Sequence, residues 1–532
     1  MAAAGAGRAP HSGDGIFFGA SSVELRAHFC ERLRRQNARG ATHLSRPGHM
    51  STLQRFFRNT SVLILANALQ PVLSFYLIVT ISRKLQVEGL GAYATVFNYQ
   101  AIFQIISAFG LKNLLTRNVA QQPEEMWRYL RHGSVIALPF SLLSMLLLIV
   151  LTAVLQYGEA VLWASIIVSL SLLAAALCDV CEGVLAGIER LHIVGYTAVL
   201  ENALRVLFSL IALWQGFGLL ALVWVFVACR FARAGFYYWY LQRHTAKPVH
   251  AGRFHFDPAF ARRIVGQARV FALTMICVTV YWKVDVSILS KMRGMDEVGL
   301  YSAAYRFLML AMVVVDSFVN SLFPIISHYY HAANPAVNQF EVACKKGLQV
   351  LLVLILPVAV MLSLLAPQLI GLIYGDAFME AVPVLRILIW VVVPYAASQI
   401  FAYALVASNN QRYDLFVNAV SMAASIALNV LMIQRFGYLG AAWAALGAIF
   451  IYVALQAPFV FRRVIKFESK PLWRGGFKLL AAAACMAGVL AFFPGIQIWF
   501  LMPLAFFIYL LALLAVRLFS KQDWALATRL LK

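Results

Sequence analysis

The chain carries a long series of apolar segments, each about as long as a bilayer span, between Thr60 and about Phe519. A helix of roughly 20 apolar residues crosses a bilayer because every backbone polar group then bonds within its own segment. Hydrophobic residues make up 62% of the chain and charged residues only 12%. The pattern predicts an all-α polytopic membrane protein with about fourteen spans: 60–83, 90–112, 132–155, 160–186, 193–214, 217–241, 266–290, 298–327, 346–366, 383–406, 413–433, 438–460, 476–494 and 498–517.

Lys and Arg are distributed unevenly between the two sets of connections. One set, together with both flanks of the bundle, holds 25 of them, and the other set holds five. Basic residues favour the cytoplasmic side, so we expect both termini of this multi-pass membrane protein in the cytoplasm. The net charge of +22 then lies beside anionic lipid, and no nucleic-acid partner is predicted.

The chain divides into five parts. Residues 1–49 are rich in Ala, Gly, Arg and Ser and have no sustained apolar run. We expect them to be disordered, or an extension from a mis-assigned start. Two six-helix lobes, 50–241 and 266–460, flank a basic cytoplasmic linker at 242–265, part of which is expected to lie on the membrane surface as an amphipathic helix. Residues 461–532 supply two further spans and a tail.

An internal repeat supports this division. The sequence VEGLGAYATVF (87–97) opens the second span, and DEVGLYSAAYRF (296–307) opens the eighth. Aligning Gly91 and Tyr93 with Gly299 and Tyr301 gives an offset of 208 residues, which also carries the first span onto the seventh. Since six spans separate the copies, they share one orientation, and an axis along the membrane normal should relate them.

Four segments carry a family resemblance. They are 87–120, with Gly110, Leu111, Leu115 and Arg117; KVDVSILSKMRGMDEVGLYSAAYRF (283–307); LIYGDAFMEAVPVLRIL (372–388); and FGYLGAAWA (436–444). Their order and spacing resemble the polysaccharide transporter family, the O-antigen flippase group of the multidrug/oligosaccharidyl-lipid/polysaccharide exporter superfamily. The resemblance covers roughly residues 53–520.

The resemblance implies a function and partners. Relatives move a lipid-linked saccharide, usually on polyprenyl diphosphate, from the inner to the outer leaflet by alternating access between two lobes. Substrates in the family include precursors of O-antigen (the outer part of lipopolysaccharide), capsule and exopolysaccharide. Polysaccharide polymerase and chain-length proteins are the partners that such a function implies.

Charged residues inside the spans bear on function independently of the family. Each costs about 2.5–3.5 kcal/mol at a helix centre, so these groups must face one another, a wet cavity or a ligand. A diphosphate that crosses the bilayer needs cations, and the arginine fork binds phosphate oxygens in pairs. The substrate-binding candidates are Arg205 and Arg230 near mid-membrane and Lys283 and Arg306 in the outer third.

Local pairing is the alternative for these cations. Glu201 and Arg205 are spaced i, i+4, which favours a salt bridge within one helix, and Asp285 and Arg306 are expected at similar depth on adjacent helices. Three acids have no partner nearby in the sequence and are candidates for coupling to H⁺ or Na⁺: Asp179, Glu182 and Asp316. A buried carboxylate can exchange a proton or bind a cation as the lobes move.

Other functions lack their motifs. No phosphate-binding loop of the form G-x-x-x-x-G-K-[ST] and no H-E-x-x-H zinc motif occurs. The pair Cys178 and Cys181 lies inside an apolar helix, where packing explains it better than redox or metal chemistry. We therefore predict no catalytic residue, metal or cofactor. A cation-coupled multidrug exporter of the same superfamily is the main alternative, and a membrane polysaccharide polymerase is a more distant one.

Overall fold

The computed structural model describes most of the chain from residue 52 onward. The described ranges are 52–245, 255–331, 337–408, 410–464, 469–492 and 497–515. The chain falls into two compact units, 1–58 and 59–532, and only 52–58 of the first unit is described. The predicted extension 1–49 lies outside these ranges, as do the middle of the linker and the end of the tail.

Every described element is helical. The helices are α2 (Thr52–Ala108), α3 (Leu111–Gln121), η1 (Pro123–Glu125), α4 (Met126–Val154), α5 (Glu159–Gly187), α6 (Leu191–Trp214), α7 (Leu219–His244), α8 (Pro258–Met292), α9 (Met295–His331), α10 (Val337–Leu364), α11 (Ala366–Ile373), η2 (Asp376–Ala381), α12 (Val382–Leu388), η3 (Ile389–Val391), α13 (Val392–Ala407), α14 (Gln411–Arg463), α15 (Ser469–Phe492) and α16 (Ile498–Ala515).

These helices confirm the predicted all-α membrane architecture. Ten of the described helical stretches are long and apolar enough to cross a membrane. Two of the ten contain a backbone break, at Gln86 in α2 and at Gly437 in α14. Each of these two therefore consists of two consecutive helical segments, which we call its first and second arm. Helices α8 and α15 coincide with the remaining predicted spans. The chain is therefore a multi-pass membrane protein.

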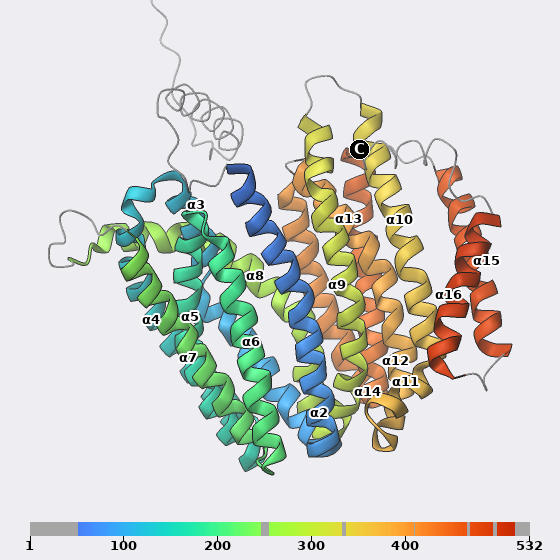
Figure 1. The fold of residues 1–532 in the computed structure, drawn as a ribbon, viewed down its shortest axis with the longest axis horizontal. Helices are drawn as coiled ribbons and strands as arrows, with labels where there is room; N and C mark the ends of the chain where they lie inside the picture. Colours follow the sequence, from blue (N-terminus) through green and yellow to red (C-terminus); the bar gives the residue numbers. More distant parts are fainter. Residues whose placement is uncertain are drawn as a thin grey trace, which may run out of the picture. The chain divides into compact units, whose positions relative to one another are not determined.

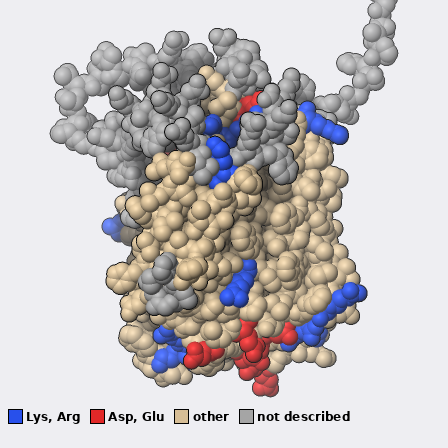
Figure 2. All heavy atoms as spheres, turned by 90° about the vertical axis from the view of Figure 1, so that its right-hand side faces the viewer, with Lys and Arg blue, Asp and Glu red and all other residues tan. Residues whose placement is uncertain are grey.

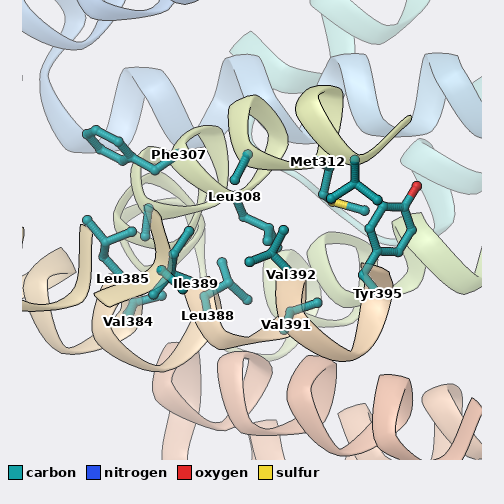
Figure 3. Packing of buried hydrophobic residues seen from close by; sticks show 14 of the residues in the cluster. Phe307, Leu308, Met312, Val384, Leu385, Leu388, Ile389, Val391, Val392 and Tyr395 are labelled. Atoms are coloured by element: carbon teal, nitrogen blue, oxygen red, sulfur yellow. The ribbon is translucent and has the colours of Figure 1, made fainter. Parts of the chain in front are cut away.

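Apolar packing gathers the helices of 59–532 into two regions (Figure 1). In one region, α5 contacts α3, α4, α6 and α7. In the other, α9 contacts α10, α12, α13 and α14, and Figure 3 shows how Leu308 and Met312 of α9 meet Leu388 and Val392. Helices α15 and α16 contact each other and α10.

The surface is consistent with a lipid environment. On the face drawn in Figure 2, uncharged side chains cover a broad middle band, and most Lys, Arg, Asp and Glu side chains lie towards its two edges. Large apolar side chains are exposed on the outside of the bundle, for example Trp224 at 52% and Phe477 at 76%. In water such surfaces mark binding sites, whereas lipid covers them in a membrane protein.

The start of α8 differs from the interfacial helix that the linker sequence predicts. Asp257 caps this helix by accepting hydrogen bonds from the backbone N–H groups of Ala259 and Phe260. Arg262 and Arg263 are exposed, but Phe260 and Ile264 are buried in the cluster that α4, α5 and α7 form. The apolar face of this segment therefore packs on protein rather than on lipid, because aromatic partners such as Tyr129, 5.2 Å away between ring centroids, already cover it.

One end of the bundle serves below as a reference. The turns 155–158, 215–218 and 293–294 follow α4, α6 and α8 and lie at one end of the bundle (Figure 1). The breaks at Gln86 and Gly437 lie at the same end, because Val87 and Gly437 contact Gly299 and Glu297 near the start of α9. We call it the Gly294 end.

Candidate functional site

The four candidate cations lie at one depth. Arg205 and Lys283 precede the ends of α6 and α8 by nine residues, and Arg230 and Arg306 follow the starts of α7 and α9 by eleven. At 1.5 Å per residue all four lie about 14–17 Å from the Gly294 end, which is near the middle of a hydrocarbon core of about 30 Å. Lys283 and Arg306 are thus deeper than the outer third that the sequence predicts.

The two arms of α2 connect these cations. On the first arm, Ser74 accepts a hydrogen bond from Arg205 (3.3 Å), and the ring of Phe75 lies 5.8 Å from that of Phe307, the neighbour of Arg306. Since α2 turns at Gln86, its second arm returns through the same level as the first. The sequence did not single out α2, although the run Ser74–Phe75 places a hydroxyl inside an apolar span.

The second arm of α2 reaches the other two cations. Asn98 donates hydrogen bonds of 2.9 Å to the backbone oxygen of Lys283 and to the hydroxyl of Ser287. The ring of Phe97 lies 4.9 Å from that of Phe226. Helix α2 therefore lies between the cations of α6 and α7 and those of α8 and α9.

Arg205 has neutral partners. Its guanidinium donates to the amide oxygen of Asn202 (2.5 Å) as well as to Ser74, and Asn202 is itself held by the backbone oxygen of Gln70 (3.0 Å). No described side chain forms an ion pair with Arg205. The i, i+4 bridge to Glu201 that the spacing favours is therefore absent, because Glu201 turns towards α7 instead.

Arg230 and Arg233 of α7 both form ion pairs with Glu201. The Nε atom of Arg230 lies 3.2 Å from one carboxylate oxygen, and an Nη atom of Arg233 lies 2.6 Å from the other. Arg230 also lies over the ring of Phe226, with Cζ 5.3 Å from the centroid, and Arg205 lies 5.8 Å from the same centroid. Phe226 thus separates a paired guanidinium from one that has no carboxylate partner among the described side chains.

Glu182, a candidate for ion coupling, is fully engaged. It forms ion pairs with Arg233 and with Lys112 of α3, the latter at 2.6 Å, and accepts a hydrogen bond from Tyr237 (3.2 Å). Buried ion pairs of this kind hold helices in register but leave little freedom to bind another cation. Glu182 therefore belongs to a network that joins α3, α5, α6 and α7.

Asp179 lies beside that network and is close enough for its charge to interact with Lys112, Arg230 and Arg233. Within the described part of the chain it forms no ion pair. Asp316 of α9 is at a different place, where it accepts a hydrogen bond of 2.7 Å from Tyr395. The structure does not bring the three candidate acids together.

Lys283 and Arg306 also form no ion pair with a described carboxylate. They are near enough for their charges to interact, and the charge of Asp285 also acts on Lys283. Asp285, the partner expected for Arg306, accepts instead from the hydroxyl of Tyr301 (2.6 Å) and from the backbone N–H of Val286. Tyr301 of α9, which is fully buried, thus takes the place of Arg306 as the partner of this carboxylate.

A groove of about 690 Å³ runs between α6 and α7. Its walls are mostly apolar and include Leu204, Phe208 and Trp224, while Glu201 and Arg233 also line it. Arg205 and Phe226 do not line this groove. Cys178 and Cys181 are buried free thiols, and no cluster of metal-ligating side chains occurs in the described ranges.

Known proteins resemble this chain in sequence and in fold. The model of the family "Polysaccharide biosynthesis protein" matches residues 56–330, and the MatE model matches 271–431. A relative from Haloferax volcanii, "Probable low-salt glycan biosynthesis flippase Agl15", is 23% identical over 454 residues, covering 81% of this chain and 89% of the relative.

Two solved structures share the fold. "Lipid II flippase MurJ, inward closed conformation" has a TM-score of 0.68 at 15% identity, covering 85% of this chain and 97% of the other. An inward-facing multidrug resistance MATE family transporter has a TM-score of 0.62 at 15% identity, covering 74% of this chain and 94% of the other. The first family model spans more than half of the chain, which confirms the resemblance seen in the sequence: the chain belongs to the family of polysaccharide biosynthesis proteins.

Proposed function

We propose that this protein is a flippase that moves a polyprenyl-diphosphate-linked oligosaccharide from the inner to the outer leaflet by alternating access between its two lobes. The observation that carries the proposal is the set Arg205, Lys283 and Arg306. These cations lie at mid-membrane depth around α2, and no described carboxylate forms an ion pair with them, although the charge of Asp285 acts on Lys283. Placing them there is costly unless an anion uses them.

The chemistry of a diphosphate fits this set. Its oxygens can accept from the guanidinium groups in bidentate fashion, while Lys283 supplies a point charge. Arg205 is held towards α2 by Asn202 and Ser74 and keeps donors for a ligand. Arg230 is already paired with Glu201, so we assign it to the support of Phe226 and Arg205 rather than to the first contact with substrate.

The names of two similar proteins support a flippase function. One is named as a glycan biosynthesis flippase and another as a lipid II flippase. As the resemblance seen in the sequence implies, the substrate would be a precursor of O-antigen, capsule or exopolysaccharide in a bacterial inner membrane, with both termini in the cytoplasm. A polymerase and chain-length proteins would then take up the product. Asp179 and Asp316 remain our candidates for coupling to H⁺ or Na⁺.

A multidrug exporter is the second candidate, because the MatE model matches 271–431. Exporters of organic cations need acids that are free to attract them. Here Glu182 and Glu201 are neutralised by arginine and lysine, and Asp285 and Asp316 are bound by tyrosines. We favour an anionic substrate because Arg205, Lys283 and Arg306 lie at one depth around α2, whereas the structure does not bring the candidate acids Asp179 and Asp316 together.

The leaflet location of lipid-linked saccharide in cells with and without the protein tests the proposal. We expect accumulation on the cytoplasmic leaflet and loss of surface polymer when the protein is absent. Arg205→Gln should reproduce this loss, whereas Arg386→Gln, at an exposed position of α12, should not. Unchanged sugar lipids together with new sensitivity to cationic drugs would support the exporter instead.

Arg230→Ala tests the original assignment of Arg230. If Arg230 only supports the site, the variant should export more slowly and keep a folded protein, since Glu201 retains Arg233. Normal surface polysaccharide in this variant would remove Arg230 from the site altogether.

A further inference from the structure

The two copies of the sequence repeat touch each other at the Gly294 end. A Cβ atom built on Gly91 would lie 1.8 Å from the backbone oxygen of Met295, and one built on Gly299 would lie 2.1 Å from that of Val87. Val87 and Met295 are separated by the same 208 residues as Gly91 and Gly299. The contact is therefore reciprocal, as at the axis of a two-fold symmetric interface.

Two cations repeat this reciprocity at the same offset. Arg83 donates to the backbone oxygens of Leu372 (2.6 Å) and Ile373 (2.8 Å) at the end of α11. Lys291, 208 residues later, donates to the backbone oxygen of Leu155 (2.8 Å) just after α4. Carbonyl groups at a helix end have no partner within the helix and attract cations. Each half of the repeat thus reaches across to a helix end of the other half.

The backbone next to these contacts is strained. Gln86 has φ 60° and ψ −167°, a conformation that is costly for a residue other than glycine. Its neighbour Val87 supplies the oxygen that meets Gly299. Such strain persists only where the surrounding contacts hold it, and it is common in segments that switch between states.

We propose that Gly91, Gly299, Arg83 and Lys291 form a reversible latch that closes the Gly294 end over the cation site, and that its opening releases the saccharide. The inference rests on the proposed alternating access. The contacts suit a reversible closure, because Arg83 and Lys291 are exposed and can exchange carbonyl oxygens for water. Glycine is required because only a residue without Cβ lets the two backbones approach so closely.

Thiol labelling tests the latch directly. Thr95 lies one turn beyond Gly91, is fully buried, and has its hydroxyl 3.4 Å from the sulfur of Met295. A Thr95→Cys reporter, with the seven native cysteines replaced, would be reacted with a water-soluble maleimide in purified protein in lipid nanodiscs. Both faces are accessible there, so the assay does not depend on orientation.

Gly91→Ala and Gly299→Ala act as wedges. We expect each to speed labelling about tenfold, because overpacking a tight contact shifts a closed–open equilibrium by about that factor. Gly158→Ala is the matched control, since it lies at the same end and a Cβ there would meet nothing within 4 Å. Arg83→Ala with Lys291→Ala opens the latch without adding volume, and Lys84→Ala, at the exposed neighbouring position, is its control.

The outcomes separate the latch from the proposed function. Faster labelling in the wedge and cation variants, but not in the controls, supports the latch. Unchanged labelling in both sets, or equal acceleration by Gly158→Ala, overturns it. If the latch variants label faster while the parent protein moves no lipid-linked saccharide, the latch stands and the flippase proposal fails.

Discussion

Replacing Glu201 by glutamine should strongly destabilise the α5–α7 charge network. Glu201 bridges two arginines, at 3.2 Å and 2.6 Å, and its side chain is 9% exposed. Breaking a buried ion pair from one side costs about 3–5 kcal/mol because the remaining charge stays buried. Glutamine can still accept one hydrogen bond, so we expect about 3 kcal/mol.

The contacts also predict which variants lose more free energy of unfolding. Arg230→Gln should cost less than Glu201→Gln, about 1–2 kcal/mol. Glu201 then keeps its ion pair with Arg233, whereas loss of Glu201 leaves Arg230 without an ion pair among the described residues. The double variant should cost less than the sum of the two, since residues in one network couple by about 0.5–3 kcal/mol. Arg205→Gln combined with Glu201→Gln should instead be nearly additive.

Reversible unfolding in mixed micelles, with increasing SDS, measures these free energies. Glu159→Gln, at an exposed position in the first turn of α5, controls for the loss of one carboxylate. The reasoning is wrong if Glu201→Gln costs no more than Glu159→Gln. It is also wrong if Glu201 couples to Arg205 more strongly than to Arg230, which would restore the pairing that the i, i+4 spacing favours.

Three further predictions concern binding, packing and pH. Arg205→Ala should weaken binding of a diphosphate lipid by about 1.5–3 kcal/mol, the range for a hydrogen bond to a charged group, and Arg205→Lys should weaken it less, as tested by titration with a fluorescent analogue. Gly183→Ala should lower the melting temperature, because its Cβ would lie 2.7 Å from the backbone oxygen of Lys112, and we expect a loss of about 1–3 kcal/mol in the free energy of unfolding. Gly235→Ala, whose Cβ meets nothing within 4 Å, should raise the melting temperature. The backbone N–H of Phe260, with Arg128, holds the pKa of Asp257 below its ordinary value. The stability that this cap contributes is therefore fully present at pH values above the ordinary pKa and is lost as the pH falls through the lowered pKa. The melting temperature should depend more steeply on pH in the parent than in Asp257→Asn, and identical profiles would contradict this.

The membrane architecture could be predicted because it depends on quantities that the sequence displays directly. Span length and hydropathy are properties of single segments. In the bilayer, a helix satisfies the backbone N–H and C=O groups within its own segment. The repeat at Gly91 and Gly299 could be detected for the same reason. Its physical purpose, a contact between the two copies, could not be seen, because it depends on how α2 and α9 meet.

The pairing of charges could not be predicted from spacing. Glu201 and Arg205 are ideally spaced along α6, yet Glu201 meets Arg230 and Arg233 of α7. Interhelical distances decide such contacts, and they follow from the packing of the whole region. Glu182 illustrates the same point, since Lys112 is 70 residues away in the sequence.

This difference between spacing and contact decides how the substrate's charge should be inferred. A count of Lys and Arg within the spans overstates the preference for an anion, because Arg230 and Arg233 form ion pairs with Glu182 and Glu201, as Lys112 does with Glu182. The three cations and two acids of this network largely compensate one another, and Asp179 lies beside them. The preference depends instead on Arg205, Lys283 and Arg306, at one depth and on both sides of α2. If these cations act together, replacing any one of them by glutamine should weaken diphosphate binding, whereas the same change at Arg233 should act mainly on stability.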